Sequence, residues 1–123
     1  MRRIKISVSE IQREAELNDS PMAEAFWKAL PIKGKANRWG DEIYFSVPVA
    51  PAEGERKDVV EEGDIAFWPS GRAFCLFFGP TPISTEKEIR PASEVILLGK
   101  VEGDLEAFKS VKEGEEVTIE KIE

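Results

Sequence analysis

The 123-residue chain contains no histidine and only one cysteine, Cys75. Without histidine, a Ser-His-Asp triad and every mechanism that uses an imidazole base are excluded. The usual zinc ligands are missing too, so we expect no bound metal. No phosphate-binding loop or dinucleotide fingerprint is present, and we expect no cofactor. A lone cysteine cannot form an intramolecular disulfide, and we interpret Cys75 as a small buried apolar residue rather than a nucleophile.

The chain also lacks long apolar runs and any excess of positive charge. No run approaches the roughly 20 residues that a membrane-spanning helix needs, and residues 1–8 resemble a first strand more than a signal peptide. Asp and Glu number 24 against 17 Lys and Arg, giving a net charge of −7. This balance disfavours nucleic-acid and anionic-lipid partners. We therefore expect a cytoplasmic protein; the many charged residues are compatible with a thermophilic source.

Short apolar segments dominate what is present, and they predict a mostly β fold. Hydrophobic residues make up 41% of the chain, which suits one globular domain over residues 1–123. Ile4, Ile6 and Val8 alternate with polar residues, as in a half-buried strand. Seven or eight strands and two short helices are expected, and their spacing favours a closed barrel over a parallel sheet. The expected strands include residues 3–8, 12–17, 33–39, 42–49, 65–68, 73–79, 95–101 and 117–119.

One helix start is well marked. The sequence Asn18-Asp19-Ser20-Pro21 offers a capping side chain followed by proline at the first helical position. Met22, Phe26 and Leu30 follow at four-residue spacing and form an apolar face, and Pro31 ends the helix. We predict that this helix plugs one end of the barrel. A second short helix is expected over residues 104–110.

The most informative stretch is an aromatic ribbon over residues 63–82, in which two apolar runs flank a Pro69-Ser70-Gly71 turn. Such a ribbon is a core hairpin, a pocket wall, or both. Trp68 stands beside the turn, and its indole N–H would need a partner if buried. A long polar connection over residues 80–93 follows, and long loops often carry function.

Alternation along residues 42–47 separates a core face from a second face. Ile43, Phe45 and Val47 should enter the core, which leaves Tyr44 and Glu42 on the other side. We predict a binding site where this second face meets the ribbon, with Tyr44, Trp68, Phe74 and Phe78 as apolar walls. The alternatives to a binding role are an exposed strand face for Glu42 and Tyr44, and a hairpin or cation–π role for Arg38. The full set of candidate ligand-binding residues is Arg38, Glu42, Tyr44, Ser46, Trp68, Ser70, Phe78 and Thr81.

Several short motifs resemble cyclophilin. They are Gly63-Asp64-Ile65-Ala66, Leu76-Phe77-Phe78 and Leu98-Gly99-Lys100-Val101. More closely, residues 39–46 and 63–82 resemble a small prokaryotic cyclophilin-like family of unknown function. The resemblance implies a closed eight-stranded cyclophilin-like β-barrel with one or two short capping helices.

The cyclophilin catalytic pattern has no secure counterpart here. That pattern is an arginine followed on the same strand by Phe-x-x-Gln-Gly-Gly, whereas this chain reads Glu42-Ile43-Tyr44-Phe45-Ser46-Val47-Pro48. We therefore assign no catalytic residue and favour a non-catalytic, pocket-bearing module that binds a peptide or small ligand. The alternative is an atypical peptidyl-prolyl cis-trans isomerase that relies on Phe78 and Arg38. A third interpretation, a structural subunit such as a homo-oligomer, would show an exposed apolar patch.

Overall fold

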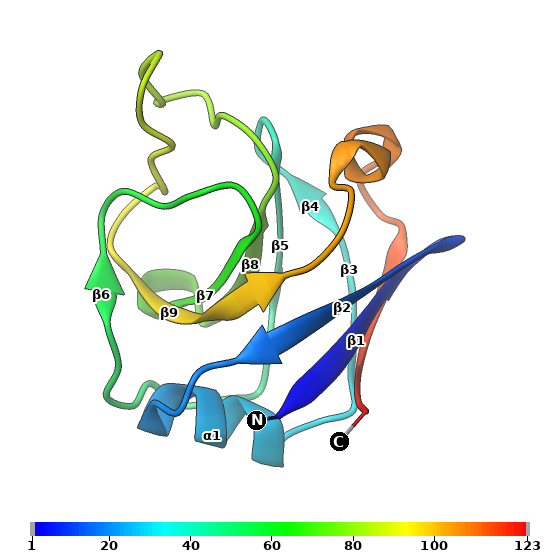
Figure 1. Cartoon of the computed structure of the whole chain (residues 1–123), viewed down its shortest axis with the longest axis vertical. Coiled ribbons are helices and arrows are strands. Elements are labelled where there is room, and N and C mark those ends of the chain that lie inside the picture. The colour runs from blue at the N-terminus through cyan, green and yellow to red at the C-terminus, as the bar shows by residue number, and fades with distance from the viewer. Residues whose placement is uncertain (1, 123) are drawn as a thin grey trace.

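The computed structural model describes residues 2–122 and contains a single α-helix and ten strand segments among them (Figure 1). Two 3-10 turns, η1 (Pro69–Gly71) and η2 (Glu106–Ser110), complete the regular structure. In chain order the elements are β1 (Arg3–Val8), β2 (Ile11–Leu17), α1 (Pro21–Lys28), β3 (Ile32–Lys35), β4 (Asn37–Arg38), β5 (Glu42–Ser46), β6 (Arg56–Lys57), β7 (Asp64–Trp68), β8 (Ala73–Phe77), β9 (Val95–Val101) and β10 (Glu116–Lys121).

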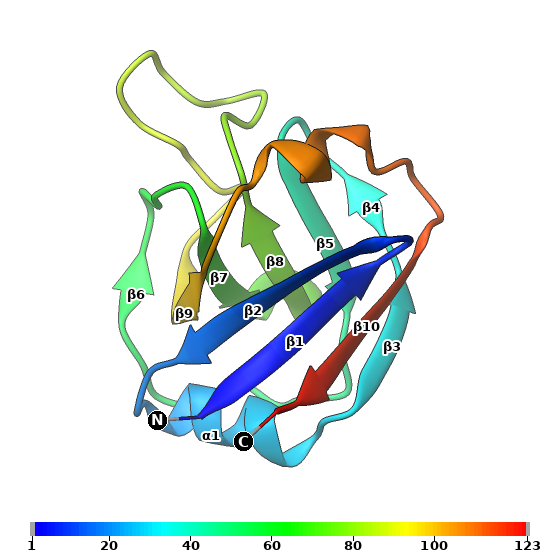
Figure 2. The same cartoon turned by 45° about the vertical axis from the view of Figure 1, so that its right-hand side comes forward.

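The strands form one antiparallel sheet that curls into a nearly closed barrel (Figure 2). Their order is β3-β10-β1-β2-β9-β7-β8-β5-β4, and β6 adds to β9 from outside this path. The two end strands, β3 and β4, are separated in the chain only by Ala36, so the first and last strands of the sheet meet. Counting β3 and β4 as one interrupted strand gives the eight strands that the sequence predicted. The predicted mostly β barrel is therefore confirmed.

Helix α1 closes one end of this barrel, at the bottom of Figures 1 and 2. The Ser20 side chain caps it by accepting a hydrogen bond from the Ala23 N–H at 3.1 Å, and Pro21 occupies the first turn. Met22 and Phe26 are fully buried beneath it. The helix ends at Lys28, two residues earlier than the apolar spacing predicted, yet Leu30 is still buried. The predicted plug is confirmed.

The barrel interior is filled by aromatic and branched side chains from alternate strand positions. Phe74 on β8 stacks on Phe26 at 5.3 Å between ring centroids and contacts Phe45 on β5 at 5.7 Å. Ile43 also points inward, so the predicted core face of β5 is confirmed. The expectation that Phe74 forms a pocket wall is wrong. Strand alternation puts Phe74 and Leu76 inside and sends Cys75 and Phe77 to the opposite face.

That opposite face of β7 and β8 carries a second, smaller apolar cluster of Val60, Ala66, Cys75, Phe77 and Val95. Tyr44, Trp68 and Ile89 pack against it from its edge. It is buried because residues 56–62 and the long loop over residues 80–94 lie across it, joined by a bridge between Val60 and Ile89. The barrel therefore has a covered outer face, and the loop leaves room at its edge.

Candidate functional site

A cavity of about 240 Å³ opens at the edge of this outer cluster. Strand β5 and its preceding turn supply one side, β7 contributes a second, and the loop leading into β9 covers it. Binding sites are commonly such concave, mainly apolar spaces with a few placed polar groups. The lining residues are Trp39, Glu42, Tyr44, Trp68, Pro91, Ala92 and Val95.

The aromatic walls of the cavity are held in defined orientations. Tyr44 and Trp68 meet edge to face, with ring centroids 6.2 Å apart and an interplanar angle of 84°. The Trp68 indole N–H donates to Ser93 Oγ at 2.6 Å, which is the partner that the sequence predicted it to need. Gly71 lies against the indole, where an added Cβ would come within 2.6 Å of the ring. The indole is thus held by the loop through Ser93 and by the η1 turn through Gly71.

Glu42 is the one carboxylate in the cavity lining, and its side chain is almost completely buried, at 5% exposure. Its hydrogen-bonding neighbour is the Cys75 thiol, and the carboxylate belongs to the cavity lining. Burial raises the pKa of Glu42 to about 7, with the nearby Cys75 thiol partly offsetting the rise. Burial, together with the Glu42 charge, raises the pKa of Cys75, so this thiol stays protonated.

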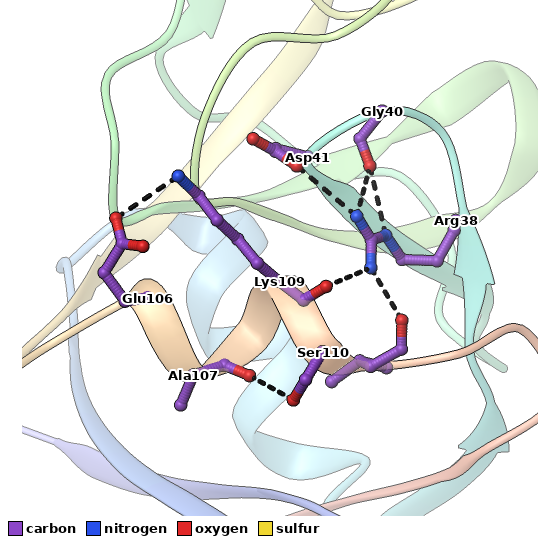
Figure 3. Close-up of polar contacts among 8 residues, drawn as sticks. Arg38, Gly40, Asp41, Glu106, Ala107, Lys109 and Ser110 are labelled. Atoms are coloured by element: carbon purple, nitrogen blue, oxygen red, sulfur yellow. Dashed lines mark hydrogen bonds and ion pairs between the residues drawn. The ribbon is translucent and has the colours of Figure 1, made fainter.

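Arg38 and Phe78 lie together, but outside this cavity. The Arg38 guanidinium sits 5.1 Å from the Phe78 ring centroid, and Phe78 is itself buried against Phe108. The guanidinium donates to the Gly40 carbonyl at 3.0 and 2.8 Å. As Figure 3 shows, it also reaches Asp41 and the carbonyl of Lys109.

A further hydrogen bond of 2.6 Å runs from Arg38 to the Val111 carbonyl. The arginine therefore fastens the β4–β5 turn to the segment around η2, in the cation–π and hairpin role that was the alternative for it.

Three other candidate residues also lie away from the cavity lining. Ser46 shares the outward side of β5 with Glu42 and Tyr44, but it lies at the exposed end of the strand and outside the cavity lining. Ser70 belongs to η1, with its hydroxyl 3.4 Å from that of Ser93. Thr81 is buried, and its hydroxyl bonds to the Arg90 carbonyl and to Ser84, so it fixes the shape of the loop. Of the eight candidates, Glu42, Tyr44 and Trp68 are brought together.

Sequence reasoning missed four lining residues, namely Trp39, Pro91, Ala92 and Val95. Trp39 carried a signal, since a large aromatic residue beside a Gly40-Asp41 turn is rarely left without a contact. For the loop residues, the sequence offered no signal beyond the length of the connection. Within residues 2–122, no group of three His, Cys, Asp or Glu side chains is placed to hold a metal ion. No helix in this range is long and apolar enough to cross a membrane.

Comparisons with known proteins agree with this architecture. The chain is similar to a hypothetical protein from Archaeoglobus fulgidus, known from a solution structure, at 47% sequence identity and a TM-score of 0.81. The match covers 98% of this chain and 94% of that chain. No curated protein matched the chain. The sequence model of the family described as cyclophilin-like matches residues 2–120, so the chain belongs to the cyclophilin-like family.

Proposed function

We propose that this protein is a non-catalytic binding module whose cavity holds a small ligand or one side chain of a peptide. The observation that carries the proposal is the joint presence of aromatic walls and a buried carboxylate in one cavity. Apolar walls give affinity, and a single placed polar group gives orientation. A buried ionisable group opposes folding, so a contact made on binding is a reason for it to be there.

Chemical-shift mapping on ¹⁵N-labelled protein tests this proposal, with benzyl alcohol and N-acetylproline methylamide as probes. We expect the indole N–H signals of Trp39 and Trp68 and the amide of Tyr44 to shift, while the signal of Trp27 stays in place. Trp27 is a suitable internal control because it lies on α1 between Arg2 and Lys121. Shifts spread over the surface, or absent with both probes, would overturn the proposal.

Proline-isomerase activity should be at the level of the uncatalysed reaction. The isomerase alternative needs an arginine and a phenylalanine beside a proline pocket, but Arg38 has its donors directed to protein oxygens and Phe78 is 2% exposed. Losing one transition-state donor typically costs about 10²–10³-fold in rate. A protease-coupled assay on a proline-containing peptide measures this, with an authentic cyclophilin as the positive control. Rates near those of the control would establish the alternative.

A further inference from the structure

We propose that the cavity selects an organic cation, an alkylated ammonium group that is enclosed by Trp39, Tyr44 and Trp68 and paired with Glu42. This inference rests on the proposed binding function and names the chemical class of its ligand. The cavity brings together the two features that recognise such a group, namely aromatic side chains and a buried carboxyl group.

The aromatic residues come from separate parts of the fold and converge. Trp39 belongs to the turn between β4 and β5, Tyr44 to β5, and Trp68 to the end of β7. An ammonium group near an aromatic face is attracted by the ring quadrupole, and tryptophan and tyrosine are the strongest such partners. The perpendicular arrangement of Tyr44 and Trp68 gives the cavity two walls of different direction, which suits a roughly spherical group better than a flat one.

The charge of Glu42 decides between ligand classes. An anion would be repelled by it, and a neutral apolar ligand would leave its charge buried and uncompensated. A cation compensates this charge at a carboxylate that is 5% exposed, where charge pairing is stronger than at the surface. The net charge of −7 on the chain also favours the approach of cations over anions.

The size of the cavity limits the group to a compact one. Its volume of about 240 Å³ lies below the usual range for drug-sized ligands, which is about 300–1,000 Å³. A trimethylammonium head fits this limit, whether it is free or carried on a lysine side chain. Pro91, Ala92 and Val95 complete the lining and add no charge.

The matched probes are choline and 3,3-dimethylbutan-1-ol, which have the same shape but differ by the positive charge. Titration at pH 8 can be followed by isothermal calorimetry and by tryptophan fluorescence. We expect choline to bind at least about tenfold more tightly than the neutral alcohol, since cation–π and ionic contacts both act on the charged probe alone. Nα-acetyl-Nε-trimethyllysine methylamide, compared with choline, then distinguishes a peptide-borne ammonium group from a free one.

Two variants make the test specific for the carboxylate. Glu42→Gln keeps the shape of the side chain and removes its charge, so the preference for choline should largely disappear while the alcohol binds as before. Glu113→Gln makes the same change in net charge at an exposed position outside the cavity lining and should keep the preference.

Binding should also depend on pH. Because the pKa of Glu42 is about 7, the free carboxyl is protonated below that pH and must lose its proton to pair with a cation. Choline affinity should therefore fall by about tenfold per pH unit below 7, whereas the affinity of the alcohol stays constant. The other titratable groups facing Glu42 are Tyr44 on β5 and the Cys75 thiol on β8, and the thiol remains protonated in this range.

Equal affinity for the two probes at pH 8, or an unchanged preference in Glu42→Gln, would overturn the cation inference. Either result leaves the proposed binding function in place if the neutral alcohol or benzyl alcohol still occupies the cavity. The absence of binding by choline, with shifts caused by benzyl alcohol, likewise removes only the cation inference.

Discussion

Replacing Glu42 by glutamine should stabilise the folded protein at pH 8 and do so much less at pH 5. In the native protein, burial raises the pKa of this carboxyl from 4.5 to about 7. Between these two values the folded state holds a proton that the unfolded state has released, so the free energy of unfolding falls as the pH rises. Above about pH 7 the folded state carries the full penalty of a buried charge. Glutamine has no such penalty.

The expected gain for Glu42→Gln at pH 8 is about 3 kcal/mol at most, since one pKa unit corresponds to about 1.4 kcal/mol. Urea unfolding of both proteins at pH 5 and pH 8 measures it, and the difference between variant and wild type cancels the titration of all other groups. Glu113→Gln is the matched control, because it makes the same change in charge at an exposed position outside the cavity lining. A gain of the same size at both pH values would contradict a raised pKa at Glu42.

A stabilising effect of Glu42→Gln at pH 8 would connect the stability of the barrel with its proposed binding function. A buried carboxylate with a raised pKa lowers stability at neutral pH, and a role in binding would account for its presence. Its penalty should be relieved when a cation enters the cavity, so choline should raise the unfolding temperature of the wild type more than that of Glu42→Gln.

Replacing Phe74 by alanine should destabilise the protein by about 3–5 kcal/mol, the usual cost of removing a buried phenylalanine ring. Phe74 is 1% exposed and joins the helix plug to the strands, because its ring contacts Phe26 of α1 and Phe45 of β5. The loss leaves a cavity between elements that cannot collapse onto each other without moving the helix. Denaturant unfolding measures the change through the midpoint concentration.

Trp68→Leu is the informative comparison, because Trp68 is only partly buried and stands at the edge of the outer cluster. We expect it to cost less stability than Phe74→Ala and to abolish most of the choline preference. The Phe74 variant, where folded, should retain that preference, since its ring lies inside the barrel. A loss of binding in Phe74→Ala with little change in stability would indicate that Phe74 does form part of the cavity wall.

The local pattern of the sequence determined most of the secondary structure. The proline-started helix, the two faces of the strand around Tyr44 and the barrel class follow from capping, alternation and spacing, which are properties of neighbouring residues. The same alternation rule predicted that Tyr44 rather than Phe45 faces outward, and the structure confirms it. These features are legible in the sequence because they depend on contacts within one element.

Tertiary structure alone decided which residues share the cavity. In the sequence, Arg38, Phe78 and Thr81 are candidates equal to Glu42 and Trp68. In the structure, Arg38 fastens a turn, Phe78 packs in the core and Thr81 fixes the shape of a loop. Their separation depends on where β5, β7 and the loop over residues 80–94 meet in space. Such long-range placement is fixed by the packing of many side chains at once, whereas composition and alternation report only on the immediate neighbours of each residue.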